Sequence, residues 1–301
     1  MLFAYIILNY KTIDLTVSAV KHIRENVTGD KIIIVVDNHS QDSSDEKILQ
    51  LETEFEDVHS VLLAENLGFS QGNNAGIEEA KKFNPDFFVI MNNDTVILQE
   101  DFQTRVVTDF YNNDNVGILG PDILINGSTS HQNPKGRRLV SHEKAEKMLS
   151  SSQKLMRQND FVLGMREKVK SLQRVKQFVR NFKDVASGNK SQTDYKRPKV
   201  GTLVLHGSFF IVPRSTIMAF GELLDNRPFF YMEMEILAVR LAKLGLDSLY
   251  DPDIKVVHEQ NASTNVSFDT AVKKVRFQAQ QMANSLEVYL KILEENRKDG
   301  E

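Results

Sequence analysis

The sequence has no cysteine among its 301 residues. The absence of thiols excludes disulfide scaffolds, zinc–thiolate sites, iron–sulfur clusters and cysteine nucleophiles. No apolar run approaches the roughly 18–20 residues that a membrane-spanning helix needs. The apolar segment at residues 2–8 is short, lacks a basic leader and is followed at once by Asn9, so we predict a buried first strand rather than a signal peptide. We therefore expect a cytoplasmic protein.

Apolar runs alternate with amphipathic stretches along the first 120 residues. The composition, 41% hydrophobic and 26% charged, is that of a globular protein with a packed core. Strands that alternate with helices in this way predict an α/β fold with a parallel, doubly wound sheet, in which ligands bind at the carboxyl ends of the strands. The expected strands are 5–8, 32–37, 58–64, 87–92 and 116–120, and the expected helices are 13–26, 42–55, 73–83 and 100–112.

The second half of the chain predicts further strands and a long C-terminal helix. Residues 202–212 and 253–259 have strand character, and a helix is expected to begin near Tyr231. Near the C-terminus, apolar residues recur at steps of three and four from Val272 to Leu293. This seam either packs on the protein's own domain or forms a short coiled-coil contact in a homodimer.

Residues 135–199 differ sharply in charge from the rest of the chain. They contain eighteen Lys or Arg residues against six Asp or Glu residues. Apolar residues at helical spacing from Met165 to Ala186 predict a basic amphipathic helix within this segment. Such a helix is either simply solvated or bound to an anionic membrane, where each Lys or Arg contributes about 1 kcal/mol. Aromatic interleaving and known motifs are absent, so nucleic acid is not an expected partner.

Polar side chains follow the expected strands, at the point where each strand ends. Because the carboxyl ends of parallel strands share one edge of a sheet, these side chains should converge on one rim. Asp37 can accept hydrogen bonds there from a base or ribose, or it can cap the turn that follows. The rim residues are Asn9, Tyr10, Asp37, Asn38, Asn66, Asn92, Asn93 and Asp94.

The segment at 65–77 is rich in glycine and amide side chains, among them Gly68, Gly72 and Asn73. It predicts a loop before a helix at 75–83, with backbone that can approach a ligand closely and a helix N-terminus that supplies donors. The segment matches neither a GxGxxG nor a Walker motif, so a phosphate cradle is not indicated.

Asp94 follows an apolar run and two asparagines. A carboxylate in this place can hold Mg²⁺ or Mn²⁺ as a single protein ligand, while substrate phosphates and water fill the other positions. Such an ion neutralises the charge that develops on a departing diphosphate. The alternative is a capping aspartate without a ligand.

An ordered set of segments resembles the family 2 glycosyltransferases, and within them the rhamnosyltransferase-like, polysaccharide-building branch. The segments are LNYKTIDLT (8–16), VVDNHSQDSS (35–44), ENLGFSQGNNAGI (65–77), MNNDTVI (91–97), HGSFFIVPR (206–214), FFYMEMEILAVR (229–240) and VVHEQNAS (256–263). The resemblance covers roughly residues 2–125 and 200–265. It implies a GT-A fold and an inverting transfer from a nucleotide-diphosphate sugar, UDP- or dTDP-linked, to a saccharide or lipid-linked acceptor of a surface polysaccharide.

The same resemblance implies a division of the chain and roles for rim residues. Asn9, Asp37 and Asn66 would meet the nucleoside, and Asp94 stands in the place of the family's metal-binding DxD motif as the main ligand. His258 has the position of a late histidine near diphosphate and metal; the alternative is a structural histidine. The expected parts are a nucleotide-sugar half (1–134), a basic helical insertion (135–199), an acceptor-binding and catalytic half (200–265) and a C-terminal amphipathic helix (266–301).

An inverting transfer needs a general base for the acceptor hydroxyl. Relatives carry it as an aspartate in a pattern like E-D-x-D-L-x-x-R, but this chain has Met234 and Ile236 at the two aspartate positions. Glu233 or Glu235 would then serve as the base at the start of a helix, and we favour Glu233. The alternative is a catalytically impaired protein that binds sugar nucleotides in an assembly.

Two further expectations concern the acceptor and the reaction class. Gly207 and Ser208 are expected to line the acceptor side, where a glycine leaves room for a sugar; the alternative is a close backbone crossing. A sugar nucleotidyltransferase shares this type of sheet. It would need a glycine-rich basic loop directly after the first strand, and residues 9–16 do not provide one.

Overall fold

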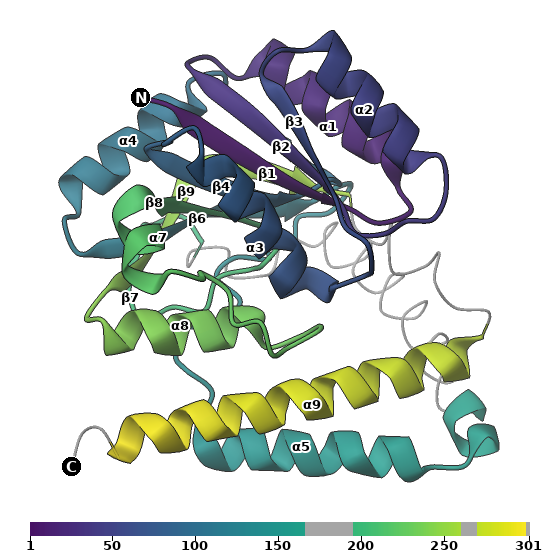
Figure 1. The fold of residues 1–301 in the computed structure, drawn as a ribbon. Helices are drawn as coiled ribbons and strands as arrows, with labels where there is room; N and C mark the ends of the chain where they lie inside the picture. Colours follow the sequence, from purple (N-terminus) through teal and green to yellow (C-terminus); the bar gives the residue numbers. More distant parts are fainter. Residues whose placement is uncertain (166–194, 260–269, 299–301) are drawn as a thin grey trace, which may run out of the picture.

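The computed structural model describes residues 1–165, 195–259 and 270–298, which form one large sheet with helices on both faces and a further layer of two helices (Figure 1). The strands are β1 (Phe3–Asn9), β2 (Lys31–Asp37), β3 (Val58–Leu62), β4 (Phe87–Asn92), β5 (Thr95–Ile97), β6 (Val116–Ile125), β7 (Lys199–Gly201), β8 (Phe209–Pro213) and β9 (Asp247–His258). The helices are α1 (Ile13–Asn26), α2 (Ser44–Glu54), α3 (Gly68–Lys81), α4 (Phe102–Asn112), α5 (His142–Arg157), α7 (Arg214–Phe220), α8 (Glu233–Lys243) and α9 (Ala271–Lys298). In these ranges no helix is both long and apolar enough to cross a bilayer.

The strands of the described residues form a sheet of nine, in the order β3-β2-β1-β4-β8-β6-β9-β5, with β7 paired to β9. Strands β1 to β4 are parallel, as the alternating pattern predicted, whereas β8 runs antiparallel to both β4 and β6. The chain moves outward from β1 to β3 and then returns to the other side of β1 with β4. The strand order therefore reverses between β1 and β4, which is where ligands bind in open α/β sheets.

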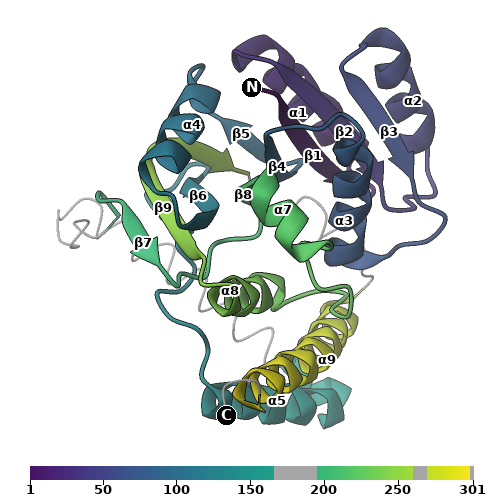
Figure 2. The ribbon, with the colours of Figure 1, turned by 60° about the vertical axis from the view of Figure 1, so that its left-hand side comes forward.

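Both faces of the sheet are buried, which explains why the strands read as continuous apolar runs. Tyr5 and Ile7 face a core with α1, α2 and α4, while Ala4 and Ile6 face a core with α3, α7 and α8. Figure 2 shows the two helical layers on opposite sides of the strands. The fold class predicted from the sequence is confirmed.

Helices α5 and α9 lie side by side and form a third core with α8 (Figures 1 and 2). Arg276 near the start of α9 donates to the Met156 carbonyl at the end of α5 (2.7 Å), and Tyr289 further along α9 donates to the Val140 carbonyl (2.7 Å) just before α5, so the helices are antiparallel. The predicted apolar seam of the C-terminal helix thus packs within the chain. The buried members of this third core are Ala145, Met232, Ile236, Val239, Leu286, Tyr289 and Ile292.

Three sequence predictions of local structure need comment. The helix expected at 75–83 begins at Gly68, so the predicted loop at 65–77 is wrong over most of its length. The strand expected at 202–212 begins only at Phe209. The basic amphipathic helix predicted for 165–186 lies, apart from its first residue, outside the described residues.

Leu286→Ala is expected to lower the free energy of unfolding by about 2–5 kcal/mol, because it leaves a cavity in the core between α8 and α9. Leu286 is fully buried, whereas Leu244 at the end of α8 is 48% exposed. Leu244→Ala is the matched control and should change the same quantity by no more than about 0.5 kcal/mol. Urea unfolding of both variants measures the difference, and equal effects would contradict the packing of α9 described above.

Candidate functional site

The carboxyl ends of β1, β2 and β4 meet at one edge of the sheet. Asn9 pairs with Asp37 in the register of β1 and β2, and Leu8 pairs with Asn92 in that of β1 and β4. The structure therefore brings together the strand ends that the sequence singled out. Tyr10 follows β1 directly at this edge and is partly buried.

Asn9 and Asp37 are joined by a buried network. The Asn9 amide donates to Asp37 Oδ1 (2.7 Å), and Ser40 donates to the same carboxylate through its backbone N–H (2.9 Å) and its hydroxyl (2.6 Å). A carboxylate has about four acceptor positions, so three bonds from within the protein leave one free. Asp37 thus shapes the turn after β2, and its contact with a base or ribose stays a prediction.

Asn93 is fixed to the first turn of α1. Its amide donates to the hydroxyls of Thr12 and Thr16, each at 2.8 Å, and Thr16 in turn donates to Asn9 Oδ1 (2.9 Å). Asn92 pairs through its backbone N–H with the Ser208 carbonyl (2.8 Å). The two asparagines therefore brace the turn that carries Asp94 between α1 and the approach to β8.

The amides around the start of α3 hold that helix in place. Asn38 bridges to the turn, accepting from Leu67 N–H (2.9 Å) and donating to the Gly68 carbonyl (3.0 Å). Asn66 accepts from Gly68 N–H (3.0 Å), and Asn73 donates to the Phe69 carbonyl (2.8 Å). These side chains, predicted to meet a nucleotide sugar, have protein partners in the structure.

The glycines of α3 allow the backbone to approach other parts of the protein. Gly68 has φ +76°, and a Cβ there would lie 2.4 Å from the Phe229 carbonyl oxygen. A Cβ on Gly72 would lie 2.7 Å from Leu8 Cδ1 on β1. The close approach at these two glycines is to other parts of the protein, and the predicted approach to a ligand stays a prediction.

Asp94 and His258 face each other at the end of β9. The distance from Asp94 Oδ1 to His258 Nε2 is 3.2 Å, and both residues are buried. Thr95 pairs with His258 in the register of β5 and β9, which fixes the two side chains relative to each other. Asp94 Oδ1 nevertheless has no hydrogen-bond donor. A buried carboxylate oxygen without a donor, beside an imidazole nitrogen, fits the ligand set of a divalent cation.

These two residues would supply only part of a coordination shell. Across residues 1–165, 195–259 and 270–298, no group of three or more His, Asp or Glu side chains is arranged to hold a metal ion. A cation at Asp94 and His258 would complete its shell with phosphate oxygens and water, as Mg²⁺ and Mn²⁺ commonly do at substrate sites.

His206, which the sequence reading did not single out, lies beside His258 with 5.8 Å between the ring centroids. Its Nδ1 accepts from the backbone N–H (3.2 Å) and hydroxyl (2.8 Å) of Ser208. Burial, with smaller contributions from the nearby His258 and Lys135, lowers the pKa of His206 to about 4. The ring is therefore neutral at pH 7 and adds no charge next to Asp94.

Gly207 lies where the end of the 203–208 segment crosses α8 and α3. A Cβ on this glycine would lie 3.3 Å from Met234 Cγ and 3.7 Å from Phe69 Cζ. Ser208 is buried, and its hydroxyl donates to His206. These neighbours are side-chain atoms, so both the acceptor role of Gly207 and the alternative of a close backbone crossing stay predictions.

The two candidate bases begin α8. Tyr231 and Met232 before them have φ values of +75° and +63°, so the helix starts abruptly after a left-handed turn. Burial raises the pKa of Glu233 to about 7, a shift that its backbone N–H and the positive charge of Lys135 partly offset. Glu233 is therefore a carboxyl group whose proton exchanges near neutral pH, as a general base requires.

Glu235 has a different environment from Glu233. Its Oε1 forms an ion pair with Lys135 Nζ at 2.7 Å, while its Oε2 is buried without a hydrogen-bond partner. The charge of Lys135 also lowers the pKa of Glu233 and that of His206. The sequence placed this lysine only in the basic segment; the antiparallel bridge of Gly136 to Val204 brings it to the site.

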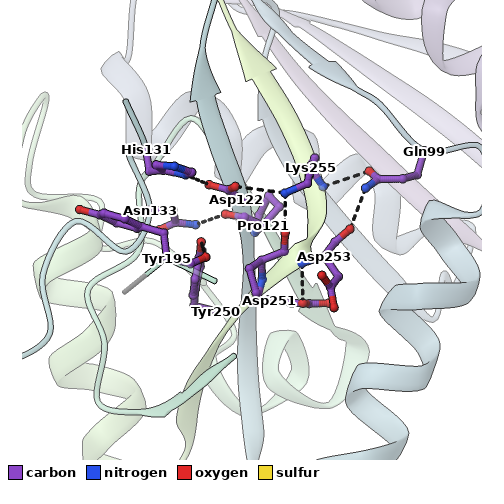
Figure 3. A network of polar contacts seen from close by, with 11 residues as sticks. Gln99, Pro121, Asp122, His131, Asn133, Tyr195, Tyr250, Asp251, Asp253 and Lys255 are labelled. Atoms are coloured by element: carbon purple, nitrogen blue, oxygen red, sulfur yellow. Dashed lines mark hydrogen bonds and ion pairs between the residues drawn. The ribbon is translucent and has the colours of Figure 1, made fainter. Parts of the chain in front are cut away.

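A second polar network anchors the loop that carries Lys135 (Figure 3). Buried Asp122 on β6 lies 2.7 Å from His131 Nδ1 and 3.4 Å from Lys255 Nζ on β9. The His131 ring stacks on Tyr195, with centroids 4.6 Å apart, and Asn133 donates to the Pro121 carbonyl (2.8 Å). The loop from 126 to 136 is thereby tied to β6 and β9 along its length.

Comparison with solved structures shows the same architecture at low sequence identity. The mannosyltransferase PcManGT from Pyrobaculum calidifontis, in complex with GDP-Man and Mn²⁺, is similar with a TM-score of 0.53 and 12% identity, over 93% of this chain and 68% of that one. TarS 1–349 from S. aureus gives a TM-score of 0.53 and 9% identity, over 94% and 69%. GalNAc-T7 with UDP, GalNAc and Mn²⁺ gives 0.55 and 11%, over 87% and 44%.

At these identities the similarity shows the fold, which is the GT-A fold expected from the sequence. No curated protein matches the chain significantly. The family model described as glycosyl transferase family 2 matches residues 5–173, more than half of the 301 residues. The chain belongs to glycosyl transferase family 2.

Proposed function

We propose that this glycosyltransferase moves a sugar from a nucleoside-diphosphate donor, UDP- or dTDP-linked, to a saccharide or lipid-linked acceptor of a surface polysaccharide. The observation that carries the proposal is the buried, donorless Asp94 Oδ1 beside His258, at the end of the sheet where ligands bind. Two of the structural neighbours contain a nucleotide or nucleotide sugar together with Mn²⁺, which supports the choice of ligand.

Asp94 and His258 would hold Mn²⁺ or Mg²⁺ against the diphosphate. When bound, the cation would neutralise the charge that develops on the leaving nucleoside diphosphate. His206, which is neutral at pH 7, adds no positive charge beside Asp94. The other rim residues and three residues of the 65–77 segment are assigned to the nucleotide sugar: Asn9, Tyr10, Asp37, Asn38, Asn66, Asn92 and Asn93, with Gly68, Gly72 and Asn73.

Glu233 acts as the general base in this proposal. Its carboxylate takes the proton of the acceptor hydroxyl as that oxygen forms a bond to the anomeric carbon. The bond from the anomeric carbon to the phosphate oxygen breaks on the opposite face, and the nucleoside diphosphate leaves with the electron pair, so the configuration inverts. Glu235 and Lys135 set the charge around the base, and Gly207 and Ser208 border the acceptor.

The parts of the chain divide this work. Residues 1–134 bind the donor and residues 200–265 bind the acceptor and carry the base. The basic insertion at 135–199 contacts an anionic membrane, which would place the cytoplasmic enzyme at the inner face of the cell membrane beside a lipid-linked acceptor.

Nucleoside diphosphates are expected to stabilise the purified protein in the presence of Mn²⁺. UDP, dTDP and GDP are compared by thermal shift with and without Mn²⁺; at 100 times its Kd a ligand adds about 2.7 kcal/mol to the free energy of unfolding. The matching nucleotide sugars are then assayed for transfer and hydrolysis. Stabilisation without turnover of any donor would favour the binding-subunit alternative, and no stabilisation by any nucleotide would contradict the proposal.

A further inference from the structure

Gln132 contacts the imidazole of His258 on the side away from Asp94. Gln132 Oε1 lies 2.8 Å from His258 Nδ1, while His258 Nε2 lies 3.2 Å from Asp94 Oδ1. We infer that Gln132 is a positioning residue, which fixes the tautomer of His258 so that Nε2 presents a lone pair to a divalent cation. This inference rests on the proposed function, since it concerns the same cation.

The hydrogen bond to Gln132 decides which ring nitrogen carries the proton. An amide oxygen only accepts, so His258 Nδ1 must donate, and in a neutral ring Nε2 then has no hydrogen. Nε2 and Asp94 Oδ1 would consequently face each other as two acceptors. This explains why Asp94 Oδ1 has no donor although a ring nitrogen is close. A cation satisfies both atoms at once, whereas the other tautomer would satisfy Asp94 without one.

Gln132 is held in place by backbone pairing. Its N–H donates to the Ile123 carbonyl of β6 (2.9 Å), and β6 in turn pairs with β9 so that Ile125 lies opposite His258. The neighbouring His131 is fixed by Asp122 on the same strand (Figure 3). The spacing between Gln132 and His258 is therefore set by the sheet itself, as metal-ligating histidines require of their outer partners.

The test measures Mn²⁺ affinity directly, by the electron paramagnetic resonance signal of free Mn²⁺ during titration with protein. Gln132→Met removes the acceptor and is expected to weaken Mn²⁺ binding about 10–100-fold. Gln132→Glu keeps an acceptor and should bind Mn²⁺ at least as tightly as the wild type. The matched control is Gln99→Met, because Gln99 also bonds to β9, at the Asp253 carbonyl (2.7 Å) and Lys255 N–H (3.0 Å), but away from His258 (Figure 3).

Wild-type Mn²⁺ affinity in Gln132→Met would overturn the inference. If Asp94→Asn lost Mn²⁺ binding in the same assay, the metal site of the proposed function would still be supported. If the wild type shows no Mn²⁺ binding that depends on Asp94, both fail. Nitrogen-15 NMR of wild-type His258 needs no variant: a protonated Nδ1 is expected in the metal-free protein, and a protonated Nε2 would overturn the inference.

Discussion

Asp94→Asn is expected to lower the rate of sugar transfer about a thousandfold. The variant removes the negative charge that Asp94 places beside His258, and with it the residue proposed as the main ligand for the cation. Metal stabilisation of a developing charge supplies several kcal/mol, and each 1.36 kcal/mol corresponds to a factor of ten in rate, so a loss of about 4 kcal/mol accounts for the estimate. Transfer assays at saturating donor and Mn²⁺ measure the effect.

The same substitution should not destabilise the fold. Asp94 Oδ1 is buried without a donor, and an asparagine amide in its place can donate to His258 Nε2. The melting temperature of Asp94→Asn without metal is therefore expected to equal or exceed that of the wild type, which separates loss of activity from loss of structure. Exposed Asp114 provides the control: Asp114→Asn should retain full activity. An Asp94→Asn enzyme with more than a tenth of the wild-type rate would contradict the assigned role.

The parallel half of the sheet could be predicted because its strands are buried on both faces and so read as short apolar runs. The start of α3 could not. Gly68, Gly72 and Asn73 all have low helix propensity, and the sequence there is typical of a loop. Packing overrides this preference: Gly72 and Gly76 lie so close to Leu8 and Ile6 that only glycine fits, and the contact with β1 stabilises the helix.

Some residues of the candidate site could be predicted because a local sequence pattern marks them. Asp94 and His258 each follow an apolar run, and the structure places them 3.2 Å apart. Gln132 and Lys135 carry no such local signal, because their partners His258 and Glu235 are distant in the sequence and only the sheet brings them together. Asn93, in contrast, was predicted to meet the nucleotide sugar, but its amide donates to Thr12 and Thr16 at the start of α1.

Glu233→Gln is expected to reduce transfer about 10²–10⁴-fold, the usual contribution of a general base. Burial raises the pKa of Glu233 to about 7, so wild-type kcat/KM should increase with pH through about 7 as the carboxyl group loses its proton. The residual activity of Glu233→Gln should lack this inflection. Glu235→Gln is the matched comparison: it removes a negative charge that raises the pKa of Glu233, so the inflection should remain and move to lower pH.

Unfolding experiments test the same carboxyl group without any substrate. The pKa of Glu233 in the folded protein lies above its ordinary value of 4.5, so the folded state binds more protons than the unfolded state between about pH 4.5 and 7. The free energy of unfolding of the wild type should therefore fall as the pH rises through this window. Glu233→Gln resembles the protonated form and should not show this fall, so it should be more stable than the wild type at pH 8 but not at pH 4. Wild-type transfer by Glu233→Gln together with inactivity of Glu235→Gln would assign the base to Glu235. The ion pair between Glu235 and Lys135 would then have to open during catalysis.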